Sequence, residues 1–294
     1  MIGHILVVDG GGTKTAASLY DVRGDELASV MAGPSSLTQE LEGGCATIAA
    51  VIEQLLLQTR TEAPDCSIVV GVAGAGNPVQ RQALAAGLNA YPHLLITTDA
   101  QLALYGANLG RPVNVITLGT GSVAMQLTAT GDTRQLGGWG FPIADHGGGA
   151  QLGFSAVQAL IDAYDAGDIA QSPCLLALQD KIGTTRCDIL AWVRQAKAKD
   201  YAALSHIVAQ HSERCTLAHE LMLKAAQAVD ALIDKMGRDN ILPIVLLGGM
   251  AQVIYPYLSQ QHRQRIIPTQ GSALSGGVLL AKKELERGPH GRRQ

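Results

Sequence analysis

Two segments of the chain share one design, and this repetition constrains the fold more than any other feature. The first runs from His4 to Asp21 and reads HILVVDGGGTKTAASLYD: an apolar run, a carboxylate at Asp9, a glycine turn and a second apolar run. The second begins at Pro112 and reads PVNVITLGTGSVAMQLTATGD, with the turn GTGS between two apolar runs. Each segment predicts a β-hairpin. Two such units roughly 110 residues apart, each followed by helical patterns, indicate a duplicated domain.

The glycine turns are suited to holding phosphate groups. Glycines lack a Cβ atom and let the backbone approach a polyphosphate, and the N–H groups of a tight turn form an anion-binding concavity. Thr13, Lys14 and Thr15 add hydroxyl and ammonium donors, and Asp9 is a candidate ligand for hydrated Mg²⁺. The turn matches the spacing of neither the Walker loop nor the dinucleotide fingerprint. Both of those loops also lead into a helix, whereas this turn leads into a second apolar run. Alone, the first turn is equally well an ordinary hairpin turn, whereas the two turns together predict loops that hold one polyphosphate from opposite sides.

Composition argues against several classes of protein. Apolar residues make up 47% of the 294 residues and charged residues 16%, which is typical of folded domains and not of disordered chains. The net charge of −3 argues against a nucleic-acid partner. No apolar segment approaches the ~20 residues of a membrane-spanning helix, and Met1 leads directly into a strand-like run, so we expect no membrane partner and no signal peptide. Five scattered cysteines predict reduced thiols and a cytoplasmic location.

A carboxylate follows one of the predicted buried strands. The apolar runs Ser67–Gly76 and Leu94–Thr97 are typical of buried parallel strands, and helices are predicted over 41–61 and 78–88. Asp99 lies just beyond the second run, where ligands gather in open α/β sheets. The same position suits a helix N-cap, so the sequence leaves both interpretations open.

The glycine-rich segment LGGWGFPIADHGGGAQLG, from Leu136 to Gly153, predicts a shaped loop followed by a helix. Asp145 stands among these glycines and is placed to hydrogen-bond a hydroxyl group. Trp139 either lies against a sugar ring or packs on the surface, and the sequence does not decide between the two.

The segment from 154 to 235 is predicted to be helical. Within it, His211, Cys215 and His219 follow one another at i, i+4 and i+8 and are expected to share a helix face. That spacing allows zinc binding, but no second cluster accompanies it, so we favour a packed or exposed face.

The last third of the chain supplies a candidate site for a flat ring. A buried strand is predicted over Ile244–Leu247 and ends in Gly248 and Gly249. A glycine pair there lets the backbone lie against a ring such as adenine. A short last strand is predicted in IIPTQ, and a final helix with small residues at its start follows.

Seven motifs stand in order along nearly the whole chain: DGGGTKT, GVAGAG, TTDA, GTGS, GGWGFPIADHGGG, LLGGMAQ and SALSGGVLLA. This series resembles the BadF/BadG/BcrA/BcrD-type ATPases of the sugar kinase, Hsp70 and actin superfamily, and most closely the bacterial N-acetylglucosamine and glucosamine kinases. The resemblance implies an α/β fold of two ribonuclease H-like domains with an interdomain cleft. It implies an N-terminal domain over 1–106, joined by a C-terminal helix at about 278–290, and a second domain with helical insertions over 107–277.

The resemblance also implies an activity: transfer of phosphate from ATP, with Mg²⁺, to the 6-hydroxyl of N-acetylglucosamine or glucosamine. ATP and a sugar are then the small-molecule partners, and a homodimer is expected. Asp9 matches the Mg²⁺-associated carboxylate, and Asp99 matches the general base and also contacts the sugar. The positions that match the family's phosphate-binding residues are Gly11, Gly12, Thr13, Lys14, Thr15, Gly119, Thr120, Gly121 and Ser122. Gly248 and Gly249 match its adenosine-binding residues, and Ser36, Gly74 and Asp145 match its sugar-binding residues.

Two departures from the family pattern concern the sugar. Ser36 stands where relatives commonly have asparagine, and His146 stands where they have an acidic or amide residue. These positions leave open which hexosamine or hexose is the acceptor.

Other functions were weighed. An activator ATPase of a reductive dehydratase needs cysteine ligands for an iron–sulfur cluster, and the scattered cysteines offer no convincing set. A non-catalytic sugar sensor is disfavoured by the presence of both Asp9 and Asp99. A chaperone or filament ATPase is disfavoured because the chain has no room for a substrate domain or large insertions.

Overall fold

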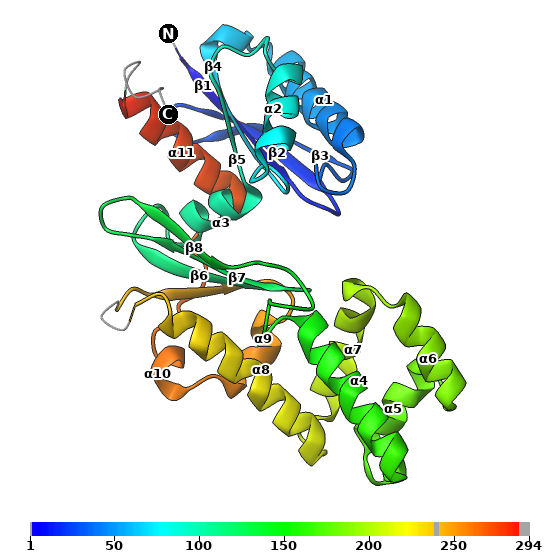
Figure 1. The fold of residues 1–294 in the computed structure, drawn as a ribbon. Coiled ribbons are helices and arrows are strands. Elements are labelled where there is room, and N and C mark those ends of the chain that lie inside the picture. The colour runs from blue at the N-terminus through cyan, green and yellow to red at the C-terminus, as the bar shows by residue number, and fades with distance from the viewer. Residues whose placement is uncertain (1, 238–240, 288–294) are drawn as a thin grey trace. The chain divides into compact units, whose positions relative to one another are not determined.

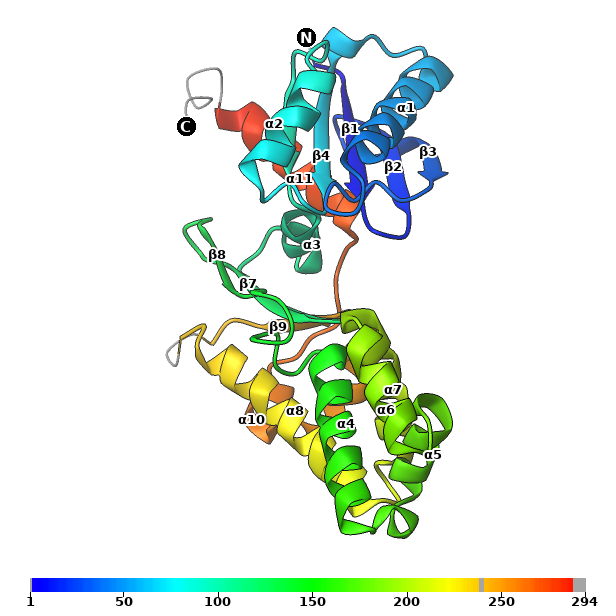
Figure 2. The ribbon, with the colours of Figure 1, turned by 45° about the vertical axis from the view of Figure 1, so that its right-hand side comes forward.

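The computed structural model describes residues 2–237 and 241–287. The chain divides into two compact units: unit 1 comprises Met1–Pro112 with Thr269–Gln294, and unit 2 comprises Val113–Pro268. Figures 1 and 2 show the chain leaving unit 1, building unit 2 and returning to unit 1 through its last helix. The domain limits implied by the resemblance stay a prediction, and residues 288–290 of the predicted C-terminal helix lie outside the described part of the chain.

Unit 1 is built on a sheet with the order β3-β2-β1-β4-β5. Its strands are β1 (His4–Gly10), β2 (Thr15–Asp21), β3 (Glu26–Ala32), β4 (Cys66–Val72) and β5 (Leu94–Thr97). The first three form an antiparallel meander, while β1, β4 and β5 run parallel. The side chains of β1 from Ile5 to Val8 are fully buried, as expected of a strand covered on both faces.

Helices cover both faces of this sheet. On one face lie α1 (Leu41–Thr59) and α2 (Pro78–Gly87), and on the other lie α3 (Asp99–Ala107) and α11 (Ala273–Arg287) (Figure 1). The short helix η1 (Ala63–Asp65) precedes β4. The buried residues of α1 recur at helical spacing, so the helix presents one apolar stripe to the sheet.

Unit 2 repeats the strand arrangement of unit 1. Its sheet has the order β8-β7-β6-β9, in which β6 (Val113–Leu118), β7 (Ser122–Leu127) and β8 (Thr133–Gly137) form an antiparallel meander and β9 (Ile244–Leu247) runs parallel to β6. The order β3-β2-β1-β4 of unit 1 is therefore matched strand by strand. This match confirms the duplication predicted from the two glycine turns.

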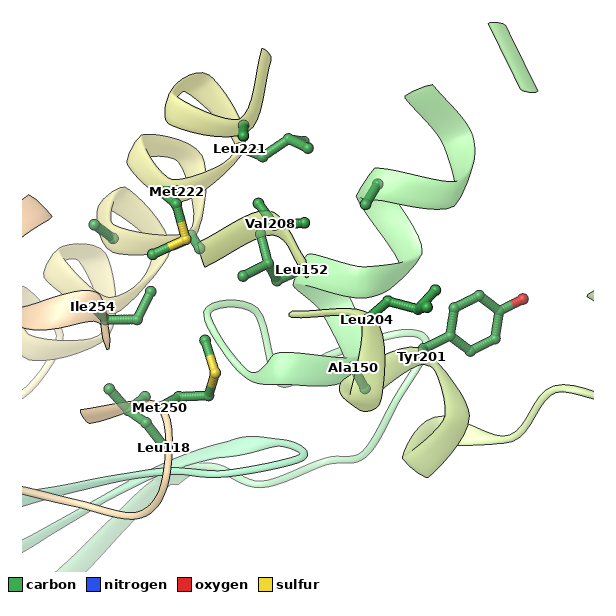
Figure 3. Packing of buried hydrophobic residues seen from close by; sticks show 14 of the residues in the cluster. Leu118, Ala150, Leu152, Tyr201, Leu204, Val208, Leu221, Met222, Met250 and Ile254 are labelled. Carbon is green, nitrogen blue, oxygen red and sulfur yellow. The ribbon is translucent and has the colours of Figure 1, made fainter. Parts of the chain in front are cut away.

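Helices, several of them long, fill most of unit 2 after its first three strands (Figure 2). They are α4 (Gly149–Ala166), η2 (Ile169–Gln171), α5 (Pro173–Ile182), α6 (Arg186–Gln195), α7 (Ala198–His211), α8 (Thr216–Asp234), α9 (Ala251–Ile254), η3 (Tyr255–Tyr257) and α10 (Gln260–Arg263). Figure 3 shows part of their core, where Leu118 of β6, Met250 and Ile254 lie beside Val208 of α7 and Leu152 of α4. None of the helices in the described part of the chain has the length and apolarity that crossing a bilayer requires.

Two predicted strands differ from their expected form. The segment IIPTQ makes a single parallel bridge between Ile244 and Ile266 in place of a strand. It occupies the position beside β9 that β5 occupies beside β4, but Pro268, which has no backbone N–H, limits its length. The strand β5 is only partly buried along Leu94–Thr97, because it lies at the sheet edge and has one strand neighbour.

The predicted helix face of His211, Cys215 and His219 is wrong. Helix α7 ends at His211, and Cys215 is the N-cap of α8, so a turn separates the three side chains. The His211 ring nitrogen Nδ1 lies 2.8 Å from the carbonyl oxygen of Ile207. In the part of the chain that the structure describes, no group of three histidine, cysteine or acidic residues is arranged to hold a metal ion.

Candidate functional site

The first glycine turn joins β1 to β2 and is largely open to solvent. Gly10 pairs with Thr15 across the hairpin, and the N–H of Gly11 donates to the carbonyl of Lys14 at 3.0 Å. Gly12, Thr13 and Lys14 are exposed. The turn therefore presents its backbone, one hydroxyl and one ammonium group to a ligand, as a phosphate-binding turn must.

Thr15 has a different environment from the rest of the turn. It is fully buried, and its hydroxyl lies 2.7 Å from both the carbonyl oxygen of Gly33 and the Oγ atom of Ser35. The Thr15 side chain thus ties the turn to the segment after β3. The structure does not bring its hydroxyl to the exposed side of the turn with Thr13 and Lys14.

Two carboxylates lie near the carboxyl ends of the parallel strands of unit 1. The pKa of Asp9, on β1, is raised to about 6, first by burial and then by the negative charge of Asp99, while the charge of Lys14 lowers it. Burial also raises the pKa of Asp99, against hydrogen bonds from backbone N–H groups at residues 99 and 100. Because each shift reflects the cost of a charge away from water, this end of the sheet favours a bound cation or proton.

Asp99 is not the N-cap of α3. The cap is Thr98, whose hydroxyl accepts a hydrogen bond from the N–H of Gln101 at 3.1 Å. Asp99 is the first residue of the helix, and its carboxylate interacts with the backbone N–H groups of residues 99 and 100. The structure thus decides against the N-cap interpretation that the sequence left open.

The segment after β3 forms a second side of this site. Its backbone is bonded to the ends of β1 and β4: the N–H of Ser35 donates to the carbonyl of Gly11 at 3.0 Å, and the N–H of Leu37 donates to that of Ala73 at 2.9 Å. Ser36, only 5% exposed, lies between these anchors. Gly74 follows β4 with a φ of +100°. Unit 1 therefore brings Ser36 and Gly74 to the same end of its sheet as Asp9 and Asp99.

The second glycine turn, between β6 and β7, is bonded to the start of α4. The carbonyls of Gly119 and Thr120 accept from the N–H groups of Gly149 and Ala150 at 2.8 and 2.9 Å. Ser122 is 5% exposed, and its hydroxyl donates to the carbonyl of His146 at 2.8 Å. The turn and the glycine-rich loop consequently form one connected structure.

Asp145 lies against this second turn. It has a φ of +61°, and its Oδ1 atom accepts from the N–H of Gly140 at 3.1 Å. A Cβ atom at Gly121 would collide with the Oδ2 atom of Asp145, so only glycine permits this approach. In unit 2, Asp145 is thus beside residues predicted to bind phosphate.

Phe141 and Trp139 of the glycine-rich loop lie in different environments. Phe141 is packed, with its ring centroid 5.7 Å from that of Phe154 and 5.3 Å from that of Tyr201. Trp139 is 87% exposed. The interpretation of Trp139 as a packed surface residue is therefore wrong, and its ring is available to a ligand.

A pocket of about 340 Å³ opens beside the second turn. Its lining comes from the turn, the start of α4, one side of α7 and the segment after β9, and consists of Gly119, Thr120, Gly149, Ala202, Ala203, Ser205, His206, Ala209, Gly249, Met250 and Val253. Of the residues predicted to bind phosphate or adenosine, it includes Gly119, Thr120 and Gly249.

Gly248 and Gly249 have separate roles. Gly248 has a φ of +92°, and a Cβ atom there would collide with the carbonyl oxygen of Leu118. It lets the chain turn beside the end of β6, where the N–H of Met250 donates to the same carbonyl at 3.0 Å. Gly249 faces the pocket, with nothing within 4 Å of where its Cβ would be.

Sequence reasoning missed the contribution of α7. Ala202, Ser205, His206 and Ala209 recur at helical spacing, so they line one wall. Their only signal in the sequence was a stripe of small residues, which is equally typical of close helix packing.

Comparisons with known proteins cover almost the whole chain. The model of the BadF/BadG/BcrA/BcrD ATPase family matches residues 6–281. The chain is 29% identical over 287 residues to the glucosamine kinase GspK of Vibrio cholerae, covering 96% of this chain and 97% of that protein. It is 23% identical to the N-acetylmuramic acid/N-acetylglucosamine kinase of Clostridium acetobutylicum, with coverage of 96% and 99%.

A solved structure extends the likeness to the fold. A Chromobacterium violaceum protein, provisionally named an N-acetylglucosamine kinase, matches with a TM-score of 0.83 and 30% identity over 95% of this chain and 99% of that one. The predicted α/β class with two sheet-based domains is confirmed. By the family match and by this likeness, the chain belongs to the BadF/BadG/BcrA/BcrD ATPase family.

Proposed function

We propose that this protein is an ATP-dependent amino-sugar kinase that phosphorylates the 6-hydroxyl of N-acetylglucosamine or glucosamine. The observation that carries the proposal is the pair Asp9 and Asp99, whose pKa values are both raised by burial near the carboxyl ends of the parallel strands of unit 1, beside an exposed glycine and lysine turn. The broader class, a phosphotransferase with an alcohol acceptor, is confirmed by curated relatives named as kinases.

Phosphoryl transfer depends on positioning and on neutralising charge at the γ-phosphoryl oxygens. The exposed turn of unit 1 supplies the Lys14 ammonium and backbone donors, and the second turn supplies further donors in unit 2. Asp9 suits Mg²⁺, because two partly buried carboxylates carry negative charge that a divalent cation relieves. When bound there, Mg²⁺ would neutralise phosphate charge.

Asp99 is the proposed general base. It is not the N-cap residue of α3, and burial raises its pKa, which makes it a stronger base than an exposed aspartate. In the proposed reaction it orients the sugar hydroxyl and accepts its proton as the oxygen attacks the γ-phosphate. Ser36, Gly74 and Asp145 are the proposed sugar contacts, and the pocket at α7 is the proposed adenosine site.

An ADP-release assay on the purified protein tests the function. Glucosamine, N-acetylglucosamine and other hexoses are compared as acceptors, and the phosphorylated position of the product is read by ³¹P and ¹³C NMR. The 6-deoxy analogue of the best acceptor should bind without releasing ADP. Phosphate on another hydroxyl, or ADP release that no sugar stimulates, would contradict the proposal.

The homodimer implied by the resemblance is part of the same proposal. Light scattering on the eluting protein measures its molar mass directly. A mass of one chain, 30.7 kDa, at micromolar concentration would contradict a stable dimer.

A further inference from the structure

The pocket at α7 offers few groups that read the edge of a base. Its alanines, glycines, Met250 and Val253 supply shape and apolar contact, which leaves Thr120, Ser205 and His206 as its polar side chains. The Ser205 hydroxyl donates to the carbonyl of Ala202 at 2.7 Å, so its single proton is already used.

Most backbone donors around the pocket are also engaged. The N–H of Gly119 donates to the carbonyl of Gly121 at 3.0 Å, that of Gly149 donates to Gly119, and that of Met250 donates to Leu118. The N–H groups of α7 from 202 to 209 lie inside the helix and bond within it. Thr120 belongs to the predicted phosphate turn and the Ser205 hydroxyl can only accept, so His206 is the polar side chain of the α7 wall that can either donate to a base or accept from it.

An imidazole ring can contact either a hydrogen-bond donor or a hydrogen-bond acceptor on a base. A neutral ring has one donor and one acceptor nitrogen, and either nitrogen can take either role by a change of tautomer. His206 can thus accept from the 6-amino group of adenine or donate to the 6-oxo group of guanine. His206 and Ala203 are exposed, so this wall does not close tightly around one base.

We propose that the pocket is a purine site without strong preference between adenine and guanine, that His206 contacts the 6-position of either base, and that the protein uses GTP as well as ATP. The proposal rests on the proposed function in taking this pocket as the base site. Apolar pockets discriminate between similar ligands by about 10–200-fold, whereas sites with fixed polar partners reach about 10⁴–10⁵-fold. The composition of this pocket corresponds to the first range.

Calorimetry with ADP and GDP on the full chain, without sugar, tests the base preference directly. We expect both to bind, with Kd values within about 200-fold of each other, and the ratio of kcat/KM for ATP and GTP to stay in the same range. A larger ratio, or no binding of either nucleotide, would overturn the inference. If both nucleotides bind and no sugar is phosphorylated, the proposed kinase function fails while the base inference stands.

Two substitutions at His206 separate base reading from a structural role. His206→Asp offers only acceptors and should raise the preference for ADP over GDP by about tenfold, while His206→Lys offers only donors and should lower it by a similar factor. The matched controls are Gln210→Asp and Gln210→Lys, on an exposed position of the same helix outside the pocket lining. The inference is wrong if both His206 variants leave the ADP to GDP ratio unchanged, or move it no further than the controls do.

Discussion

Replacing Asp9 with asparagine should stabilise the free protein and remove its activity. The pKa of Asp9 rises from 3.8 to about 6, first through burial and then through the charge of Asp99. One pKa unit corresponds to about 1.4 kcal/mol, so the ionised carboxylate costs the folded state about 3 kcal/mol. The neutral amide of Asp9→Asn avoids this cost but gives up the proposed cation ligand.

The pKa of Asp9 is higher in the folded than in the unfolded protein, and this direction determines how stability depends on pH. The unfolded carboxyl loses its proton near pH 3.8 and the folded one near pH 6, so wild-type stability falls as the pH rises through this window and is level above it. The variant and the wild type should therefore match below about pH 4. At pH 7.5 the Tm of Asp9→Asn should be higher by about 6–12 °C.

Thermal unfolding in EDTA at several pH values from 4 to 7.5 measures this difference. Asp25→Asn is the matched control, since Asp25 is an exposed carboxylate in the same unit and its replacement should leave the Tm unchanged. Adding Mg²⁺ and ADP should raise the Tm of the wild type more than that of Asp9→Asn, because only the wild type keeps the proposed ligand. Equal Tm values at pH 7.5, or a difference independent of pH, would refute the reasoning.

Three other predictions address separate parts of the structure. Asp99→Asn should lower kcat by about 10²–10⁴-fold while calorimetry still detects nucleotide binding, and near-normal turnover would rule out its role as base. His262→Leu should lower the free energy of unfolding by about 2 kcal/mol in urea titrations. The reason is that the ring is 2% exposed and its nitrogens lie 2.6 and 3.1 Å from two aspartates of α8. An unchanged urea midpoint of unfolding would contradict this prediction. Gly248→Ala should lower the free energy of unfolding by about 1–3 kcal/mol, because residue 248 has a positive φ and a Cβ there collides with β6. Gly249→Ala should leave the Tm unchanged and weaken ADP binding. Equal losses of Tm in the two variants would contradict this prediction.

Much of the fold could be predicted because its signals are local. Apolar runs ending in glycine predicted β1, β4 and β6, and the two hairpins predicted the duplicated sheet. The predictions that were wrong concern elements whose form depends on tertiary contacts. Ile266 is a β-branched residue, which is typical of strands, but it forms only an isolated bridge. The break between α7 and α8 falls in a segment, 212–215, that contains neither glycine nor proline, so no local signal predicts a division of the helix there.

The candidate site was predictable only in part, for a similar reason. Asp9 and Asp99 could be named because each follows a recognisable strand, but their interaction depends on the pairing of β1, β4 and β5. The burial of Thr15 depends on a contact with Ser35, twenty residues away in the chain. Likewise, His206 became a candidate only when α7 was seen to line the pocket at Gly249.

In both units, a short hydrogen bond joins a glycine turn that we propose to bind phosphate to a residue next to a proposed sugar contact. In unit 1 the N–H of Ser35 donates to the turn carbonyl of Gly11 at 3.0 Å, next to Ser36. In unit 2 the Ser122 hydroxyl donates to the carbonyl of His146 at 2.8 Å, next to Asp145. We therefore expect a shift of either turn to be transmitted to the proposed sugar contact beside it. Since phosphoryl transfer depends on the alignment of donor and acceptor, this linkage would couple the proposed phosphate contact of each unit to its proposed sugar contact.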